Sequence, residues 1–174
     1  MEDPLETVVA GHHAEIHRYL RRLTARGSEA DDLSQETFLR AYRAWRSLPP
    51  DANVRAWLFA IATNLSRNHF RSEKRRARAH AAVERSGSER DDHDPEGEAL
   101  SNETRALIDA VVSRLPLKQR TAFVLRKVHG FDYDAIGQNL RCSADSARAH
   151  VFQALRKIRQ TLDGHEFSRT EAHR

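Results

Sequence analysis

The sequence predicts an all-α protein made of two small helical domains, and three observations support that fold class. Apolar residues recur three and four positions apart over much of the chain, which is the spacing of amphipathic helices. No segment of useful length alternates apolar and polar residues as a strand would. Between the two helical parts, residues 84–98 are acidic, rich in turn-forming residues and almost without large apolar side chains.

Length and composition limit the classes of protein to consider. A chain of 174 residues can form one ordinary domain or two small ones. Its net charge of +4 is a modest basic excess that suits a polyanionic partner. Cys142 is the only cysteine, so no intrachain disulfide can form, which fits a reducing cytosol. Because the chain has no bilayer-length apolar run and no apolar signal core, we expect a cytoplasmic protein without membrane insertion.

The first predicted domain comprises residues 1–80. The segment 5–23 is compatible with a helix, although its apolar pattern is weak. Two clearer stripes at helical spacing follow, one of Leu33, Thr37, Ala41, Ala44 and Trp45 and one of Trp57, Leu58, Ile61, Ala62 and Leu65. Residues 81–102 are then predicted to be a flexible acidic linker, since they have too little apolar surface to offset the entropy of ordering. The alternative is a long ordered surface loop, which is uncommon within a compact domain.

The second predicted domain comprises residues 103–164. Its first apolar stripe stops at Pro116, a residue that suits the start of a new helix. Gly130 is expected to end that helix, which has an apolar face of Phe123, Val124 and Val128. Asp132 and Ser143 can then cap two further helices. These last helices, from about 133–139 and from Ser143 onward, are joined by a three-residue turn and have the spacing of a helix-turn-helix.

Two basic helix faces are candidate nucleic-acid surfaces. On the last helix, the side opposite the apolar stripe carries Arg148, Phe152, Arg156 and Arg159, which suit phosphates and base edges. On the helix after Val54, one face carries Asn64, Arg67, Asn68, Arg71 and Arg75, and nearby aromatics that could stack on unpaired bases are Trp57, Phe59, His69 and Phe70. The alternatives are solvated basic faces, a solubilising helix end, and core positions for Trp57 and Phe70.

Other constellations carry less information. Asp32, Gln35 and Glu36, with Arg40, form a polar helix face that could bind a basic protein surface or could simply be solvated. His12, His13 and His17 lie close together, but no HExxH motif accompanies them. We find no nucleophile with a recognisable base and no carboxylate dyad. We therefore expect no enzyme activity, no metal site and no cofactor.

The motifs together resemble extracytoplasmic-function sigma factors. ADDLSQETFLRAY at residues 30–42 resembles the family's core-binding segment, and RAWLFAIATNL at 55–65 resembles its next helix. LP at 115–116, QR at 119–120, GFDY at 130–133 and AI at 135–136 resemble the opening of sigma region four, which is followed by the helix-turn-helix. Each motif alone is ordinary, but the four in this order are highly specific.

The resemblance implies a role for each part of the chain. Residues 1–80 would be sigma region two and residues 103–164 sigma region four, in a factor that binds core RNA polymerase, directs promoter-specific initiation and melts the promoter. Asp32, Gln35 and Glu36 would face the polymerase clamp helices. Asn64, Arg67, Asn68, Arg71 and Arg75 would meet the minus-ten strand. The minus-thirty-five element would be read by Ser143, Arg148, His150, Phe152, Gln153 and Arg156. An anti-sigma partner is also implied.

Two alternatives and two departures remain. A stand-alone helix-turn-helix regulator would not need the Asp32 and Asn64 faces, and a metal-dependent hydrolase would use the histidines. Arg141 stands where the family often has glycine in the turn, and because positive φ would strain an arginine we expect a rearranged turn. The recognition helix also carries fewer basic residues than is usual in the family, so the promoter sequence does not follow from the resemblance.

Overall fold

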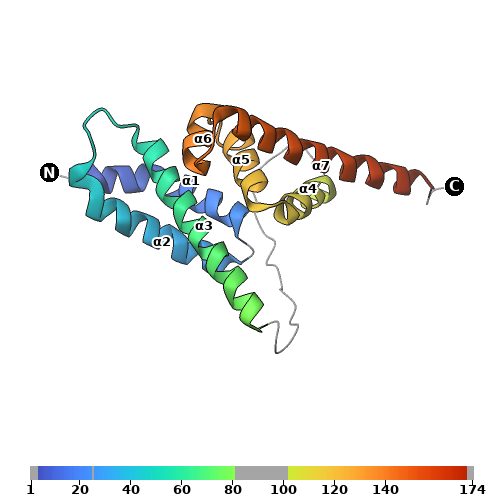
Figure 1. Ribbon diagram of the computed structural model, residues 1–174, viewed down its shortest axis with the longest axis horizontal. Coiled ribbons are helices and arrows are strands. Elements are labelled where there is room, and N and C mark those ends of the chain that lie inside the picture. Colours follow the sequence, from blue (N-terminus) through green and yellow to red (C-terminus); the bar gives the residue numbers. More distant parts are fainter. Residues whose placement is uncertain (1–3, 25, 81–101, 172–174) are drawn as a thin grey trace. The chain divides into compact units, whose positions relative to one another are not determined.

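The computed structural model describes residues 4–24, 26–80 and 102–171, and within these ranges every regular element is a helix (Figure 1). The chain divides into two compact units, one within Met1–Asp91 and one within Asp92–Arg174. The predicted all-α class with two helical units is thus confirmed. The predicted linker, residues 81–102, lies outside the described residues except for Asn102, where α4 begins.

The first unit contains α1 (Pro4–Leu23), α2 (Gly27–Ala44), the short 3-10 helix η1 (Trp45–Ser47) and α3 (Val54–His80). Helices α1, α2 and α3 all contact one another. Their shared core is formed by fully buried side chains that include Ile16, Tyr19, Leu20, Ala30, Leu58 and Phe59. In the predicted α3 stripe, Leu58, Ala62 and Leu65 are buried, whereas Trp57 and Ile61 are half-buried.

A buried hydroxyl pair joins α1 to α3. The Tyr19 and Thr63 hydroxyl oxygens lie 2.7 Å apart. Thr63 donates its own hydrogen to the Phe59 carbonyl oxygen at 2.7 Å, so Tyr19 is the donor to Thr63. Burial raises the pKa of the Tyr19 phenol far above its usual range, which keeps it protonated and able to donate. The pair thereby satisfies a polar group in the core directly before Asn64 of α3.

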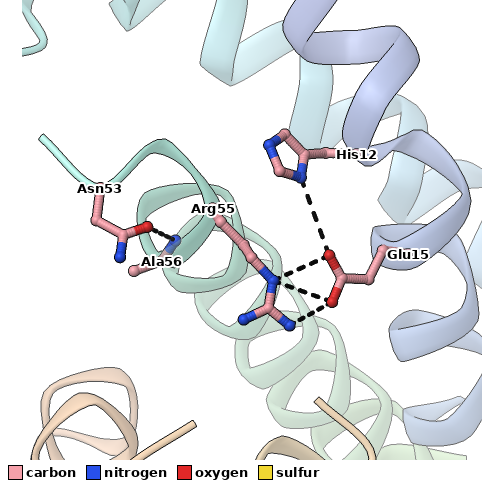
Figure 2. Close-up of polar contacts among 5 residues, drawn as sticks. All are labelled: His12, Glu15, Asn53, Arg55 and Ala56. Atoms are coloured by element: carbon pink, nitrogen blue, oxygen red, sulfur yellow. Dashed lines mark hydrogen bonds and ion pairs between the residues drawn. The ribbon is translucent and has the colours of Figure 1, made fainter. Parts of the chain in front are cut away.

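The beginning of α3 is held to α1 by an ion pair (Figure 2). Arg55 Nε lies 3.1 Å from each carboxylate oxygen of Glu15, and Arg55 Nη2 also contacts that carboxylate. His12 Nδ1 is 3.9 Å from the same group. One residue before the helix, the Asn53 side-chain oxygen accepts a hydrogen bond from the Ala56 backbone N–H at 3.0 Å. The amino-terminal end of α3 is therefore both capped and anchored.

The second unit contains α4 (Asn102–Arg114), α5 (Leu117–Lys127), α6 (Tyr133–Leu140) and α7 (Ala144–Glu171). Helix α7 packs against each of the other three. The buried side chains that fill this core include Val112, Leu115, Leu125, Ile136, Ala147 and Val151. The expectation that Val128 belongs to the apolar face of α5 is wrong, because α5 ends at Lys127 and Val128 is 45% exposed. Gly130, which the sequence predicts to end this helix, has a φ of 71° and lies three residues after Lys127, the last residue of α5.

The turn between α6 and α7 combines two caps with a left-handed residue. Asp132 accepts a hydrogen bond from the Ala135 N–H at 2.7 Å, and Ser143 accepts one from Ser146 at 3.1 Å, as the sequence predicted. Arg141 adopts φ 55° and ψ 51°, so the expectation that the turn avoids positive φ is wrong.

Close packing of the backbone accounts for this turn. The Cys142 N–H donates to the Gly137 carbonyl oxygen at 2.9 Å. A Cβ at Gly137 would lie 2.7 Å from the Cys142 carbonyl oxygen, which is closer than carbon and oxygen can pack. The turn therefore follows so tightly on α6 that the chain adopts a left-handed conformation even at an arginine.

Candidate nucleic-acid and polymerase-binding surfaces

The outer face of α7 is exposed, as the sequence predicted. Ala147, Val151, Ala154 and Ile158 are buried on the inner side. On the outer side Arg148, Gln153 and Arg156 are exposed, and Phe152 is 66% exposed. An aromatic ring among arginines on an exposed helix face can contact apolar groups, while its neighbours contact phosphates and base edges.

Arg148 is held by two neighbours instead of projecting freely. Its Nη1 lies 3.2 Å from Asp145 Oδ1, and its guanidinium carbon lies 5.0 Å from the centre of the Tyr133 ring. Arg126 approaches the same ring at 4.7 Å and donates to the Phe131 carbonyl oxygen at 2.9 Å. The ring and the carboxylate orient one edge of the Arg148 guanidinium and leave its other N–H groups for a ligand.

Gln153 takes part in a hydrogen-bonded chain that reaches α5. Gln119 Nε2 donates to Gln153 Oε1 at 2.8 Å, and Lys157 Nζ donates to Gln119 Oε1 at 3.0 Å. Gln119 lies in the first turn of α5, while Gln153 and Lys157 are one helical turn apart on α7. The outer surface of the helix-turn-helix therefore includes the beginning of α5.

Two residues of the predicted minus-thirty-five set, Ser143 and His150, differ from the exposed residues on the outer face of α7. The Ser143 hydroxyl caps α7 and contacts the Ser146 hydroxyl at 3.0 Å. His150 is half-buried, and burial, together with the nearby charge of Lys118, lowers the pKa of its imidazole. The lowered pKa favours the neutral imidazole, so His150 is less suited to contact phosphates than the arginines of α7.

The basic face of α3 lies on the exposed side of the first unit. Asn68, Arg71 and Arg75 are exposed, whereas Asn64 and Arg67 are half-buried nearer the core. Phe59 does not belong to this surface, contrary to the sequence-based expectation, because it is fully buried with its ring centre 4.9 Å from that of Tyr19. Trp57 is half-buried beside Trp45, at 6.3 Å between ring centres.

The polar face of α2 is wider than the sequence indicated. Asp32 and Gln35 are exposed, and Glu36 pairs with Arg40 at 2.7 Å. Farther along the same helix, Leu39 is 44% and Tyr42 is 66% exposed. An exposed apolar pair next to acidic and amide groups is the composition of a protein-binding surface, with an apolar centre and a polar rim.

The clustered histidines of α1 are engaged with neighbouring side chains. His17 Nε2 lies 2.7 Å from Asp31 Oδ1, and the His13 ring stacks on Phe38 with 5.5 Å between ring centres. Throughout the described ranges, no group of three or more His, Cys, Asp or Glu side chains is arranged to hold a metal ion. In the same ranges, no helix combines the length and apolar character needed to cross a membrane.

Comparison with known families accounts for both units. Residues 8–76 match the family described as sigma-70 region 2, and residues 105–158 match the family described as sigma-70, region 4. The chain is an extracytoplasmic-function (ECF) sigma factor. As a sigma factor it directs RNA polymerase to promoters, and nothing in the comparisons favours a stand-alone regulator.

Relatives of this sigma factor match it over most of its length. The RNA polymerase sigma-H factor of Pseudomonas aeruginosa is 29% identical over 164 residues, which are 90% of this chain and 85% of the relative. The ECF RNA polymerase sigma-E factor of Haemophilus influenzae is 26% identical over 162 residues, covering 89% and 85%. These relatives are sigma factors and not enzymes.

Solved structures share the fold. The sigma factor RpoE of Bartonella quintana, crystallised with the anti-sigma factor NepR, has a TM-score of 0.79 at 20% identity and covers 91% of this chain and 96% of that one. CnrH, in complex with the cytosolic domain of CnrY, has a TM-score of 0.65 at 24% identity and covers 92% and 88%.

Sequence reasoning missed several residues of these surfaces. In the sequence, Gln119 is noticeable only within the QR motif, and Tyr133 only within the GFDY motif and as the start of a predicted helix. Each meets its partner across a tertiary contact, and 34 positions separate Gln119 from Gln153. Leu39 and Tyr42 could have been noticed, since their three-residue spacing places both on the same side of α2 as Asp32 and Gln35.

Proposed function

We propose that this sigma factor binds core RNA polymerase through α2 and reads promoter DNA with α3 and α7. The observation that carries the proposal is the outer face of α7, where Arg148, Phe152 and Arg156 are exposed on the second helix of a helix-turn-helix. Such a helix fits the major groove of duplex DNA. In this sigma factor that duplex would be the minus-thirty-five element.

The α3 face would bind the minus-ten strand. Arg71 and Arg75 are exposed one turn apart and would contact phosphates, whereas Asn64 and Asn68 can both donate and accept hydrogen bonds with base edges. Opening a duplex costs a few kcal/mol per extruded base, so a surface that holds the freed strand favours melting. The anchored beginning of α3 and the Tyr19–Thr63 pair would keep this face in a fixed orientation.

The surface of α2 would contact the polymerase. Asp32 and Gln35 supply hydrogen-bond acceptors, and Leu39 and Tyr42 supply apolar area next to them. Burying an apolar centre contributes most of the affinity of such an interface, while the polar rim contributes specificity. The predicted partner surface is the basic face of the clamp helices of the polymerase's largest subunit.

Two DNA-reading surfaces on one chain strengthen each other. Once one surface is bound, the other searches at a high effective concentration, so two weak contacts act as one strong contact. The division into region two (residues 1–80), a linker (81–102) and region four (103–164) is part of this proposal. The place of action is the cytoplasm, and an anti-sigma factor such as the one bound to the Bartonella relative would hold the chain inactive.

Transcription from purified components tests the proposal. Core polymerase with this chain should start at defined sites on genomic DNA, which sequencing of the transcripts locates, and core polymerase alone should not. Glu36→Arg combined with Gln35→Ala should weaken competition for core polymerase without unfolding the chain. Equal competition by the double mutant would exclude this face of α2, and the absence of defined start sites would exclude the function.

A further inference from the structure

The side chains of Lys157, Gln119 and Gln153 are linked by two hydrogen bonds, and it can be decided which group donates in each. A lysine ammonium can only donate hydrogen bonds, so its partner on Gln119, 3.0 Å away, must be the carbonyl oxygen of that amide. The other end of the Gln119 amide is then the NH₂ group, which donates to Gln153 at 2.8 Å. The atom of Gln153 that accepts is therefore Oε1, so Lys157 determines how both amides are oriented.

This direction determines what Gln153 can offer to a ligand. Its Oε1 is engaged by Gln119, and Gln153 itself is exposed on the outer face of α7. Within the described ranges its Nε2 group has no hydrogen-bond partner, so it presents two N–H donors. A glutamine that pairs with both N6 and N7 of adenine needs a free oxygen as well as a free nitrogen.

We infer that Gln119 is a specificity-determining residue, because it makes Gln153 a hydrogen-bond donor toward the major groove. The base edge that this donor fits is guanine, which presents two neighbouring acceptors, N7 and O6. This inference rests on the proposed function, in which α7 reads the upstream promoter duplex. Gln119 belongs to α5 and acts on the base through Gln153, so it is a positioning residue.

Binding to DNA would strengthen the arrangement. In the free protein the three side chains lie at the surface, where water competes for each hydrogen bond. When α7 enters the groove, water is excluded, and an amide in the wrong orientation would bury an unpaired polar group against the base. The amide orientation set by Lys157 therefore contributes more free energy in the complex with DNA than in the free protein.

The substitution Gln119→Glu reverses the hydrogen bond between residue 119 and Gln153, so that Gln153 becomes the donor. A carboxylate at this position can accept both from Lys157 and from the Gln153 NH₂ group, which turns Oε1 of Gln153 toward the groove. Gln153 would then accept a hydrogen bond, and its preferred partners become the amino groups of cytosine and adenine. Gln119→Leu removes the constraint and leaves the Gln153 amide free to adopt either orientation.

The test is selection of holoenzyme-bound promoters from a library with a randomised upstream element. Wild-type holoenzyme should prefer guanine about tenfold at one position, a factor within the range of base-edge contacts. Gln119→Glu should shift the base preference at that position alone to cytosine or adenine. Gln119→Leu should leave no strong base preference there. Gln138→Glu adds the same charge at an exposed site of α6 that takes no part in the hydrogen bonds of Gln119. It should keep the guanine preference.

Gln153→Ala separates the two ways in which the idea can fail. If Gln153→Ala abolishes the guanine preference but Gln119→Glu leaves it intact, α7 reads DNA and the inference about Gln119 is overturned. A weakening by Gln119→Glu that is uniform over all sequences would also overturn it, since Gln153 would then contact phosphate. If wild-type holoenzyme selects no upstream sequence at all, the proposed function of α7 fails first.

Discussion

The Arg148 guanidinium lies over the Tyr133 ring, with 5.0 Å between the guanidinium carbon and the ring centre. Tyr133 begins the first helix of the helix-turn-helix and Arg148 lies in the second, so the contact joins the two helices at the surface that we propose to face DNA. A long side chain that is already oriented loses less conformational entropy on binding. In the proposed contact with DNA, the ring would therefore reduce the entropy that the Arg148 side chain loses on binding.

Replacing Tyr133 should therefore weaken upstream recognition. A cation–π contact at an exposed site is worth about 0.5–1 kcal/mol, so Tyr133→Leu should lower the affinity of holoenzyme for the upstream element roughly two- to fivefold. Tyr133→Phe keeps the ring and should bind as the wild type does. Quantitative footprinting measures both, and equal affinity for Tyr133→Leu and wild type would exclude the orienting role.

Phe152 should recognise a thymine methyl group. Its ring is 66% exposed between arginines, and burying one methyl group is worth about 0.8 kcal/mol, or roughly a fourfold change in affinity. Deoxyuridine in place of the facing thymine removes only that methyl. Wild-type holoenzyme should lose about fourfold in affinity on the modified promoter, whereas Phe152→Ala should bind both promoters equally. Insensitivity of the wild type at every upstream thymine would refute this contact.

Asn64→Ala should impair strand opening more than closed-complex formation. Asn64 is half-buried at the edge of the basic α3 face, where its amide can meet an exposed base edge. Permanganate reactivity of minus-ten thymines should fall in the variant, and a template already melted by mismatches should partly restore transcription. If Asn64 is only a surface residue of the helix, reactivity on the duplex promoter will be normal.

Glu15→Gln should destabilise the first unit. It leaves Arg55 facing a neutral amide where two carboxylate oxygens now accept its hydrogen bonds. Because the two side chains are 23% and 35% exposed, the cost lies between those of buried and surface pairs, at about 1 kcal/mol. Both tryptophans, Trp45 and Trp57, lie in this unit, so their fluorescence during urea unfolding reports on it alone.

A matched control for Glu15 exists on α3. Glu73 pairs with Arg76 at 3.0 Å, and these side chains are 46% and 70% exposed. Water screens such a pair, so Glu73→Gln should change the unfolding free energy by less than about 0.5 kcal/mol. Similar losses in the two variants would mean that charge, and not the link between α1 and α3, accounts for the effect.

Arg141→Gly should stabilise the second unit. Arg141 adopts φ 55°, a conformation that is unfavourable for a residue with a Cβ and free of that strain for glycine. We expect a gain of about 0.5–1 kcal/mol, reduced by the greater freedom of glycine in the unfolded chain. Amide hydrogen exchange in α6 measures this gain in the full chain. Arg141→Ala keeps the Cβ and should show no gain; an equal gain there would contradict the explanation.

The features that the sequence predicts correctly arise mostly from residues that are close together in the sequence. The caps at Asp132 and Ser143 follow from short side chains that meet backbone N–H groups three residues later, a relationship visible in the sequence itself. Phe59 is buried, contrary to the sequence-based expectation, because α3 packs against both α1 and α2 and its buried face is wider than one apolar stripe. The partners of Gln153 and Arg148 come from other helices, and no periodicity in the sequence indicates them.

Gly137 bears on how promoter preference could be transferred between sigma factors. Because Gly137 has no side chain, the turn packs directly against α6. The position of α7 relative to α6 therefore depends on contact between the backbone at Gly137 and the backbone of the turn. A larger residue there would push the turn away from α6 and tilt α7, so that all the base contacts that we propose for α7 would shift together. Under the proposed function, the segment from α6 through α7 should therefore be transferred as one piece if its promoter preference is to be kept.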